Sequence, residues 1–183
     1  IKLKTMKTII TLALIIISSN TLTQNIQKYS LTVTAGAFFP LGTLDNRITS
    51  GYNIGLDLEV RNRGLAVYLN SKINFVKENS STREFFSGSN DDTRAYNLIE
   101  INAGPRFLIG NMKELYVNID LGFGLYTGSY LKEVLWGPQV GAGFNYPVTS
   151  KLTIVINSRL NVIGFDEGLL YIGLHSGLQY TFE

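Results

Sequence analysis

The chain of 183 residues is long enough for a single domain, and it contains no cysteine, which excludes disulfides, cysteine-ligated zinc, thiol catalysis and a lipidated cysteine. Its formal net charge is only +2 and its basic residues form no long run, so the composition predicts no nucleic-acid partner. No apolar run reaches the roughly 18 residues that a transmembrane helix needs.

Residues 1–23 have the composition of a secretory signal peptide. Met6 is the expected start, which makes the residues before it an upstream extension. A lysine precedes the apolar stretch Ile9–Ile17, which is too short to span a bilayer, and a small polar stretch follows. We expect cleavage before Gln24 and a mature β-barrel of residues 24–183; an uncleaved N-terminal anchor is the alternative.

The rest of the chain consists of segments in which apolar and polar residues alternate with a period of two, which is typical of β-strands. Their lengths are close to the roughly 9–11 residues with which a tilted strand crosses a bilayer. Pro105 and Pro138 lie within such segments, and we expect them to mark bulges or strand ends because proline lacks a backbone donor. The eight predicted strands are Tyr29–Phe39, Gly51–Asn62, Leu65–Phe75, Ala95–Ile109, Glu114–Tyr126, Val134–Tyr146, Leu152–Val162 and Leu170–Phe182.

The connections between these strands alternate in length. Those after the second, fourth and sixth strands are tight, whereas those after the first, third and fifth are longer and polar; residues 77–94 form the longest. Outer-membrane barrels have short periplasmic turns and longer external loops. The pattern therefore predicts that both chain ends lie on the periplasmic side.

Alternation alone does not say which face points inward, since a soluble lipocalin-like barrel would show the same pattern. The apolar faces of the predicted strands carry no Asp, Glu, Lys or Arg, and nearly every strand glycine, such as Gly104, Gly141 and Gly177, falls on the polar face. An eight-stranded barrel has room inside only for side chains, so the face relieved by glycines is the crowded inner one. This distribution predicts that the apolar face points to lipid.

Aromatic residues cluster at both ends of the apolar faces, as in the two aromatic girdles of membrane barrels. Tyr146 and Phe182 lie near one rim, and Tyr52 and Trp136 near the other. In hydrocarbon every backbone polar group must be paired, so the last strand must pair with the first. The predicted fold is an all-β, eight-stranded antiparallel up-and-down transmembrane β-barrel.

Four short motifs carry a resemblance to a known family: Pro40–Gly42, Gly51–Gly55, Ala103–Phe107 and the terminal stretch His175–Phe182. The chain resembles the small outer-membrane β-barrels labelled "porin family" or "outer membrane protein β-barrel domain", relatives of the OmpA and OmpX barrels. The terminal stretch is similar to that family's C-terminal recognition signal, although Glu183 follows the final aromatic. The resemblance implies export to the Gram-negative outer membrane, outer-membrane lipid as a partner, and recognition by the barrel-assembly machinery.

The polar faces bring equal numbers of acids and bases into the predicted lumen. Buried charges are tolerated only when they are paired, so we expect an internal salt-bridge network that plugs the barrel. A gated or narrow polar pathway is the alternative, whereas a wide pore needs about 16 strands. The residues concerned are Asp57, Glu59, Glu100 and Asp120 against Arg61, Lys72, Arg106 and Arg159, with His175 on the last strand.

The sequence predicts no catalytic, cofactor or metal site. His175 is the single histidine and is expected to face the lumen, while its neighbour Ser176 faces lipid, so the two cannot form a catalytic pair. Asn90–Asp92 is interpreted as a solvated loop tip rather than a calcium site. We expect a structural or interaction protein that meets a surface ligand or protein partner through residues 77–94; a small-solute or ion conduit, or a lipid-acting enzyme, is the alternative.

Overall fold

The computed structural model describes residues 28–78, 95–129, 131, 133–164 and 168–182. The predicted signal peptide and most of the long connection at residues 77–94 lie outside the described residues. No helix among the described residues is long and apolar enough to cross a membrane. The strands are β1 (Lys28–Leu41), β2 (Gly51–Asn62), β3 (Leu65–Lys77), β4 (Ala95–Ile109), β5 (Tyr116–Gly128), β6 (Leu135–Pro147), β7 (Leu152–Ile163) and β8 (Leu169–Phe182).

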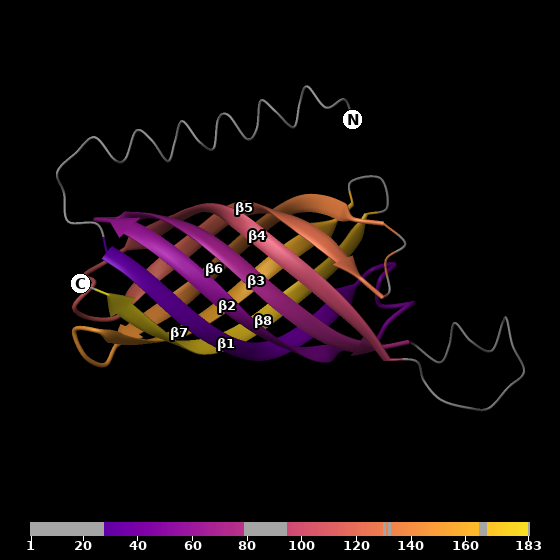
Figure 1. Cartoon of the computed structure of the whole chain (residues 1–183), viewed down its shortest axis with the longest axis horizontal. Helices are drawn as coiled ribbons and strands as arrows, with labels where there is room; N and C mark the ends of the chain where they lie inside the picture. The colour runs from indigo at the N-terminus through magenta and orange to yellow at the C-terminus, as the bar shows by residue number, and fades with distance from the viewer. Residues whose placement is uncertain (1–27, 79–94, 130, 132, 165–167, 183) are drawn as a thin grey trace, which may run out of the picture.

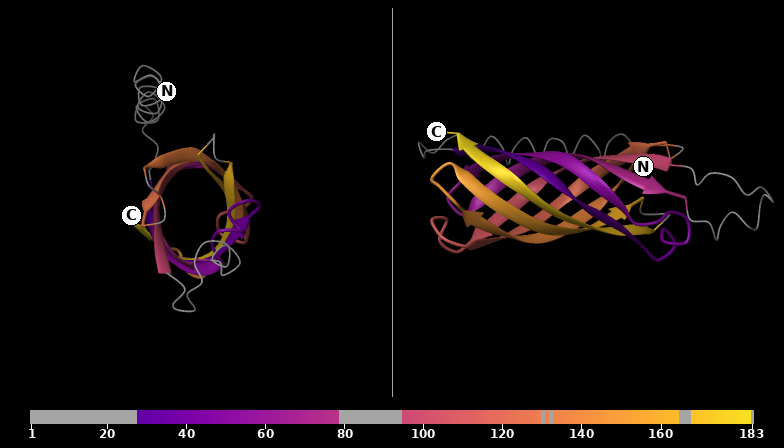
Figure 2. Two further views of the ribbon diagram at one scale, coloured as in Figure 1. Left: turned by 90° about the vertical axis from the view of Figure 1, so that its right-hand side faces the viewer. Right: turned by 90° about the horizontal axis from the view of Figure 1, so that it is seen from below.

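The eight strands form one closed antiparallel barrel in chain order, and every predicted strand end agrees with the structure to within two residues (Figure 1). Strand β8 pairs with β1 from Tyr29↔Phe182 to Leu41↔Leu170, so the sheet has no free edge, as Figure 2 shows from one end. The predicted closure is therefore confirmed. Closure pairs the backbone groups that an open sheet would leave exposed to hydrocarbon.

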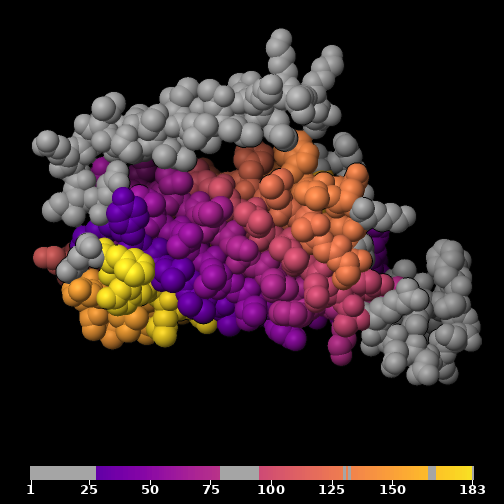
Figure 3. Space-filling view, viewed as in Figure 1, coloured from indigo at the N-terminus to yellow at the C-terminus, as the bar shows by residue number. Residues whose placement is uncertain are grey.

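The two faces of the sheet have opposite chemistry. Polar and charged side chains point inward and are buried: Asp120 and Asn102 are both 0% exposed. Large apolar side chains point outward on all the strands, with Leu56 50% and Ile156 57% exposed, and we call them the apolar belt. Figure 3 shows one side of the outer surface that the strands form. A soluble barrel would place these side chains inside, so the burial confirms the predicted sidedness.

Aromatic rings gather at the rims of this outer belt. Tyr52 on β2 stacks on Phe75 of β3 with the ring centroids 4.9 Å apart, and Tyr180 meets Phe182 edge-on at 5.0 Å. These pairs lie at opposite ends of the barrel. Tyr52 is paired with Ala37 near the end of β1, whereas Phe182 is paired with Tyr29 near the start of β1. The arrangement matches the two aromatic girdles of membrane barrels.

The two ends of the barrel differ in their connections. The start of β1 and the end of β8 lie at the same end as the connections at residues 63–64, 110–115 and 148–151, which we call the turn end (Figure 1). The connections at residues 42–50, 78–94, 129–134 and 164–168 lie at the other end, the loop end. The two longest connections, residues 42–50 and 78–94, lie at the loop end as expected, whereas residues 110–115 at the turn end are as many as residues 129–134 at the loop end.

The expectation that both strand prolines mark bulges or strand ends is wrong for Pro105. The register of β4 with β5 is the same before and after this residue, at Ala103↔Phe123 and Arg106↔Asp120, so no residue is inserted. Pairing lapses only at Gly104 and Pro105, which confines the missing donor to one short gap in the ladder. Pro138 also lies inside its strand, β6, although the pairing of β6 with β7 begins one residue later.

Candidate functional site

Charged side chains from several strands meet in the middle of the lumen. Arg106 on β4 faces its register partner Asp120 on β5 and donates to both carboxylate oxygens, Nε to Oδ1 at 2.7 Å and Nη2 to Oδ2 at 3.0 Å. Its Nη1 donates to Glu59 Oε2 at 2.7 Å, and its Nη2 also donates to Asp57 Oδ2 at 3.0 Å. A single guanidinium thus ties β4 to β2 and β5 through charge-assisted hydrogen bonds.

A second guanidinium reaches the same carboxylates from the opposite side. Arg159 on β7 donates through Nη2 to Asp120 Oδ2 at 2.8 Å and to Asp57 Oδ2 at 3.0 Å. The row of register partners between Asp120 and Arg159 contains Gly141 of β6. A Cβ on that glycine would lie 2.7 Å from Arg159 Cγ, so the lack of a side chain at this position gives Arg159 room to extend across the lumen. We call Asp57, Glu59, Arg106, Asp120 and Arg159 the central charge network.

A tyrosine ring supports both guanidinium groups. The ring centroid of Tyr68 on β3 lies 4.9 Å from Cζ of Arg106 and 5.0 Å from Cζ of Arg159, which is cation–π geometry. The Tyr68 hydroxyl donates to the Leu121 carbonyl at 3.3 Å and accepts from Nε2 of Gln139. The ring is fixed in place by these bonds and is 1% exposed.

The other charged residues that were predicted to face the lumen also form ion pairs. Lys72 Nζ on β3 lies 3.1 Å from Oε1 of its register partner Glu100 on β4, and 3.4 Å from Nε2 of His175 on β8. Arg61 Nε lies 4.0 Å from Glu59 Oε1, which is an ion pair but is beyond hydrogen-bond distance. Every one of the eight acids and bases expected in the lumen is therefore in at least one ion pair.

The alternation puts several neutral side chains on the polar face, but the sequence did not predict that they complete the network. Asn118 donates to Asp120 Oδ1 at 2.9 Å, and Asn145 donates to Asn118 Oδ1 at 2.8 Å. Both, like Tyr68 and Gln139, occupy inward positions of the alternating pattern, which is the signal that could have found them. The pattern gives their side of the sheet, but their height in the barrel depends on the register.

The loop end of the lumen is filled by apolar and aromatic side chains, which the sequence analysis did not anticipate. Phe38 stacks on Tyr171 with the ring centroids 4.4 Å apart, and Tyr171 meets Tyr126 edge-on at 6.4 Å. The Tyr126 hydroxyl donates to Asn161 Oδ1 at 3.3 Å. We call the buried residues packed here the loop-end cluster: Phe38, Leu44, Ile48, Val76, Leu98, Tyr126, Ile163, Leu169 and Tyr171.

Two members of the loop-end cluster come from the connection between β1 and β2. Leu44 and Ile48 are each 1% exposed, although the sequence suggested a polar loop. The Ile48 amide donates to the Leu44 carbonyl at 3.0 Å, and Ile48 forms an isolated antiparallel bridge with Glu78. This short folded segment therefore places two aliphatic side chains against the inward ends of the strands.

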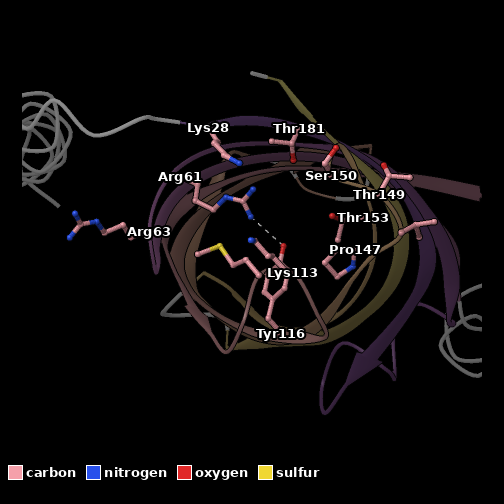
Figure 4. Close-up of a pocket in the computed structure, with 12 residues that line it drawn as sticks. Lys28, Arg61, Arg63, Lys113, Tyr116, Pro147, Thr149, Ser150, Thr153 and Thr181 are labelled. Carbon is pink, nitrogen blue, oxygen red and sulfur yellow. Dashed lines mark hydrogen bonds between the residues drawn. The ribbon is translucent and has the colours of Figure 1, made fainter.

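The turn end of the lumen instead opens into a cavity of about 600 Å³, which we call the turn-end cavity. In Figure 4, Lys28, Arg61 and Lys113 extend over the opening with Tyr116, while Arg63 points away from it. Arg61 Nη1 donates to the Tyr116 hydroxyl at 3.4 Å. Basic groups from β1, β2 and the β4–β5 connection thus share one opening.

Within the described ranges, no catalytic arrangement surrounds His175, the single histidine. His175 is buried in the lumen, whereas Ser176 is exposed on the outer face, as the sequence predicted. Among the described residues, no group of three or more His, Cys, Asp or Glu side chains is placed to hold a metal ion. Asn90–Asp92 lies outside the described residues, so its interpretation as a solvated tip stays a prediction.

No protein-family profile matches the sequence, and no curated protein matches it significantly. Solved structures do match the fold. The crystal structure of Neisserial surface protein A (NspA) aligns with a TM-score of 0.58 and 16% identity over 85% of this chain and 97% of that one. Ail of Yersinia pestis, in complex with the heparin analogue sucrose octasulfate, aligns with a TM-score of 0.54 and 12% identity over 87% of this chain and 100% of that one.

A second Ail structure, determined in a phospholipid bilayer nanodisc, aligns with a TM-score of 0.50 and 14% identity over 86% of this chain and 100% of that one. These structures are small eight-stranded outer-membrane barrels. The predicted fold class and its resemblance to that kind of barrel are therefore confirmed. The likeness, together with the apolar belt, agrees with the predicted localisation in the Gram-negative outer membrane.

Proposed function

We propose that this protein is a structural or interaction barrel of the outer membrane, with a lumen plugged by its own side chains and external loops that contact a surface ligand or a protein partner. The observation that carries the proposal is the central charge network, in which Arg106 alone joins three carboxylates from two other strands. A pathway for solutes would have to break these bonds.

The loop-end cluster gives independent support to the proposal that the lumen is plugged. Its aromatic and aliphatic side chains are almost fully buried, with Phe38 and Tyr126 both 0% exposed. An ion that entered from this end would first have to lose its water among apolar groups, which is costly. Charge pairing in the middle and apolar packing at the loop end thus oppose conduction for different physical reasons.

The longest connection, residues 77–94, is the proposed contact surface. It follows β3 and precedes β4 at the loop end, which would face outward if the turn end faces the periplasm. An Ail structure of the same fold holds a heparin analogue, which shows that such a barrel can carry a ligand. Replacing residues 79–93 by a Gly-Ser linker should remove adhesion or partner binding while the barrel still shows heat-modifiable gel mobility. Binding that survives the replacement would overturn the role of this loop.

Single-channel recording in planar bilayers tests the plug. We expect no steady conductance from the wild-type barrel. The alternative, a narrow polar conduit, draws support from side-chain oxygens of Asn70, Asn157 and Gln179 that are buried in the lumen without a protein hydrogen-bond partner, since water could bind them. A steady wild-type current that is lost or altered in Arg106→Ala would favour the conduit and reject the plug.

The proposal also includes the absence of enzymatic activity, an exported chain and assembly through the C-terminal strand. Lipid A should be unaltered in cells that overexpress the protein, whereas a change in its acyl chains would favour a lipid-acting enzyme. The N-terminus of the exported protein should begin at Gln24. Substituting the terminal aromatic, Phe182→Ala, should slow assembly by the barrel-assembly machinery relative to the exposed outer-face variant Leu178→Ala.

A further inference from the structure

We propose that the turn-end cavity binds a phosphate ester. Lys28, Arg61 and Lys113 bring three cationic groups to its opening from three separate parts of the chain (Figure 4). Among the described residues that line the cavity, none is Asp or Glu. The inference concerns the end of the barrel opposite the proposed contact loop, and it goes beyond the proposed function.

The charge at this opening is not neutralised by the layer beneath it. Asp57, Glu59 and Asp120 balance Arg106, Arg159 and the more distant Arg61 in the ion pairs described above. Glu59 in particular gives its closer contact to Arg106, at 2.7 Å against 4.0 Å for Arg61. The two lysines therefore add positive charge that no carboxylate in the cavity wall offsets, and an anion that enters is attracted.

The shape and lining of the cavity favour an anion that carries an organic body. Its volume of about 600 Å³ falls within the range of small-molecule sites, which is much more than a bare phosphate fills. Met112, Pro147 and Val148 form an apolar part of the wall, while Thr149 and Ser150 of the β6–β7 connection add hydroxyl groups. An arginine fork with two lysines is well suited to phosphate oxygens, and the hydroxyls suit a polyol portion.

Two sources could supply this chemistry at the turn end. One is a soluble phosphate ester on the periplasmic side, and the other is the headgroup of an anionic phospholipid in the adjacent leaflet.

Arg61 is held by its bond to the Tyr116 hydroxyl at 3.4 Å, so the guanidinium is oriented before a ligand arrives. Preorganisation of this kind lowers the entropy cost of binding.

The test uses the full mature chain in phosphatidylcholine nanodiscs, titrated with glycerol 3-phosphate and followed by NMR shifts of Tyr116 and the lysine side chains. In the second arm, phosphatidylglycerol replaces part of the phosphatidylcholine. We expect saturable shifts in one arm, and that arm identifies the source. The variant Lys28→Gln/Lys113→Gln should weaken binding about tenfold, as expected for the loss of charged hydrogen bonds.

The matched control is Arg47→Gln/Lys77→Gln, which removes the same charge at the loop end, where both side chains are exposed. It should keep the wild-type affinity, and heat-modifiable mobility should show that both variants are folded. Glycerol without phosphate should not bind. The proposal is overturned if neither arm saturates, or if the control variant weakens binding as much as the turn-end variant does.

Discussion

The two ends of the lumen are built on the same alternating strands, yet they have opposite chemistry. At the loop end the inward positions hold the loop-end cluster, with Leu98 and Phe38 almost fully buried. At the turn end they hold Arg61 and Tyr116 beneath an open cavity with lysines at its rim. The central charge network separates the two. An inward position is therefore not polar by rule, since its chemistry follows from what covers that end of the barrel.

The length of the connections explains the difference. The β1–β2 connection is long enough to fold back and bury Leu44 and Ile48, so apolar side chains at this end are shielded from water. The β2–β3 connection, residues 63–64, cannot cover anything. Most inward groups that face the open turn-end cavity, such as Arg61, Thr153 and Thr181, are polar or charged, and only a small apolar cluster of Ala66, Leu108 and Tyr116 is buried beside them.

The largest expected effect comes from removing the layer that separates the two ends. Arg106→Met would leave buried Glu59 with only the 4.0 Å contact to Arg61, and it would leave Asp57 and Asp120 to share Arg159 alone. We expect a loss of about 3–5 kcal/mol in the free energy of unfolding, because a buried charge without its partner is strongly destabilising. Urea unfolding in lipid vesicles measures this loss. The control is Arg63→Met, which points away from the lumen and should change stability little; equal losses would contradict the role of the network.

A matched pair of leucines on β4 compares the two ends directly. Leu98 lies in the loop-end cluster and is 1% exposed, while Leu108 faces inward at the turn end and is 8% exposed. Leu98→Ala should lower the free energy of unfolding by about 2–4 kcal/mol, since it leaves a cavity in a packed cluster. Leu108→Ala should cost about half as much, because the cavity it leaves is open to the adjacent space. Urea unfolding in lipid vesicles measures both values. A larger loss of unfolding free energy for Leu108→Ala than for Leu98→Ala would contradict the proposed difference in packing between the two ends.

A smaller effect is expected where a strand glycine gives room to the charge network. Gly141→Ala places a methyl group 2.7 Å from Arg159 Cγ, and the flexible arginine must shift away from Asp120. We expect a loss of about 1–3 kcal/mol, as for overpacking of a filled interior. The control Ala142→Gly changes the neighbouring outward position of β6. If Gly141→Ala leaves stability and the Arg159 side-chain NMR signals unchanged, then Gly141 is not needed to make room for Arg159.

The smallest effect is expected at the rim of the turn end. Lys113→Gln removes an exposed charge without a described ion pair in the barrel wall, so the free energy of unfolding should change by less than about 0.5 kcal/mol. The same urea titration checks this value. A loss comparable to that of Leu98→Ala would show that the turn end is a structural seal like the loop end, and the contrast between the two ends would fail.

The sequence alone determined the number of strands, their closure and their sidedness. These follow from local periodicity, from the glycines on the polar face and from the requirement that backbone groups be paired in lipid. It also determined which charges enter the lumen, because an inward position is fixed by its parity along the strand. Pairs such as Arg106 with Asp120 join neighbouring strands. Predicting such a pair requires only the register of the two strands in addition to the alternation.

Only the tertiary structure decided how the lumen is divided along its length. Contacts such as Arg159 with Asp57 join strands far apart in the sheet, and the stagger of the closed barrel sets which residues share a height. The burial of Leu44 and Ile48, the position of Tyr68 between two guanidinium groups and the cationic turn-end cavity depend on the same stagger. Alternation along a strand specifies the side on which a residue lies, whereas neighbours across the lumen exist only after the sheet has closed.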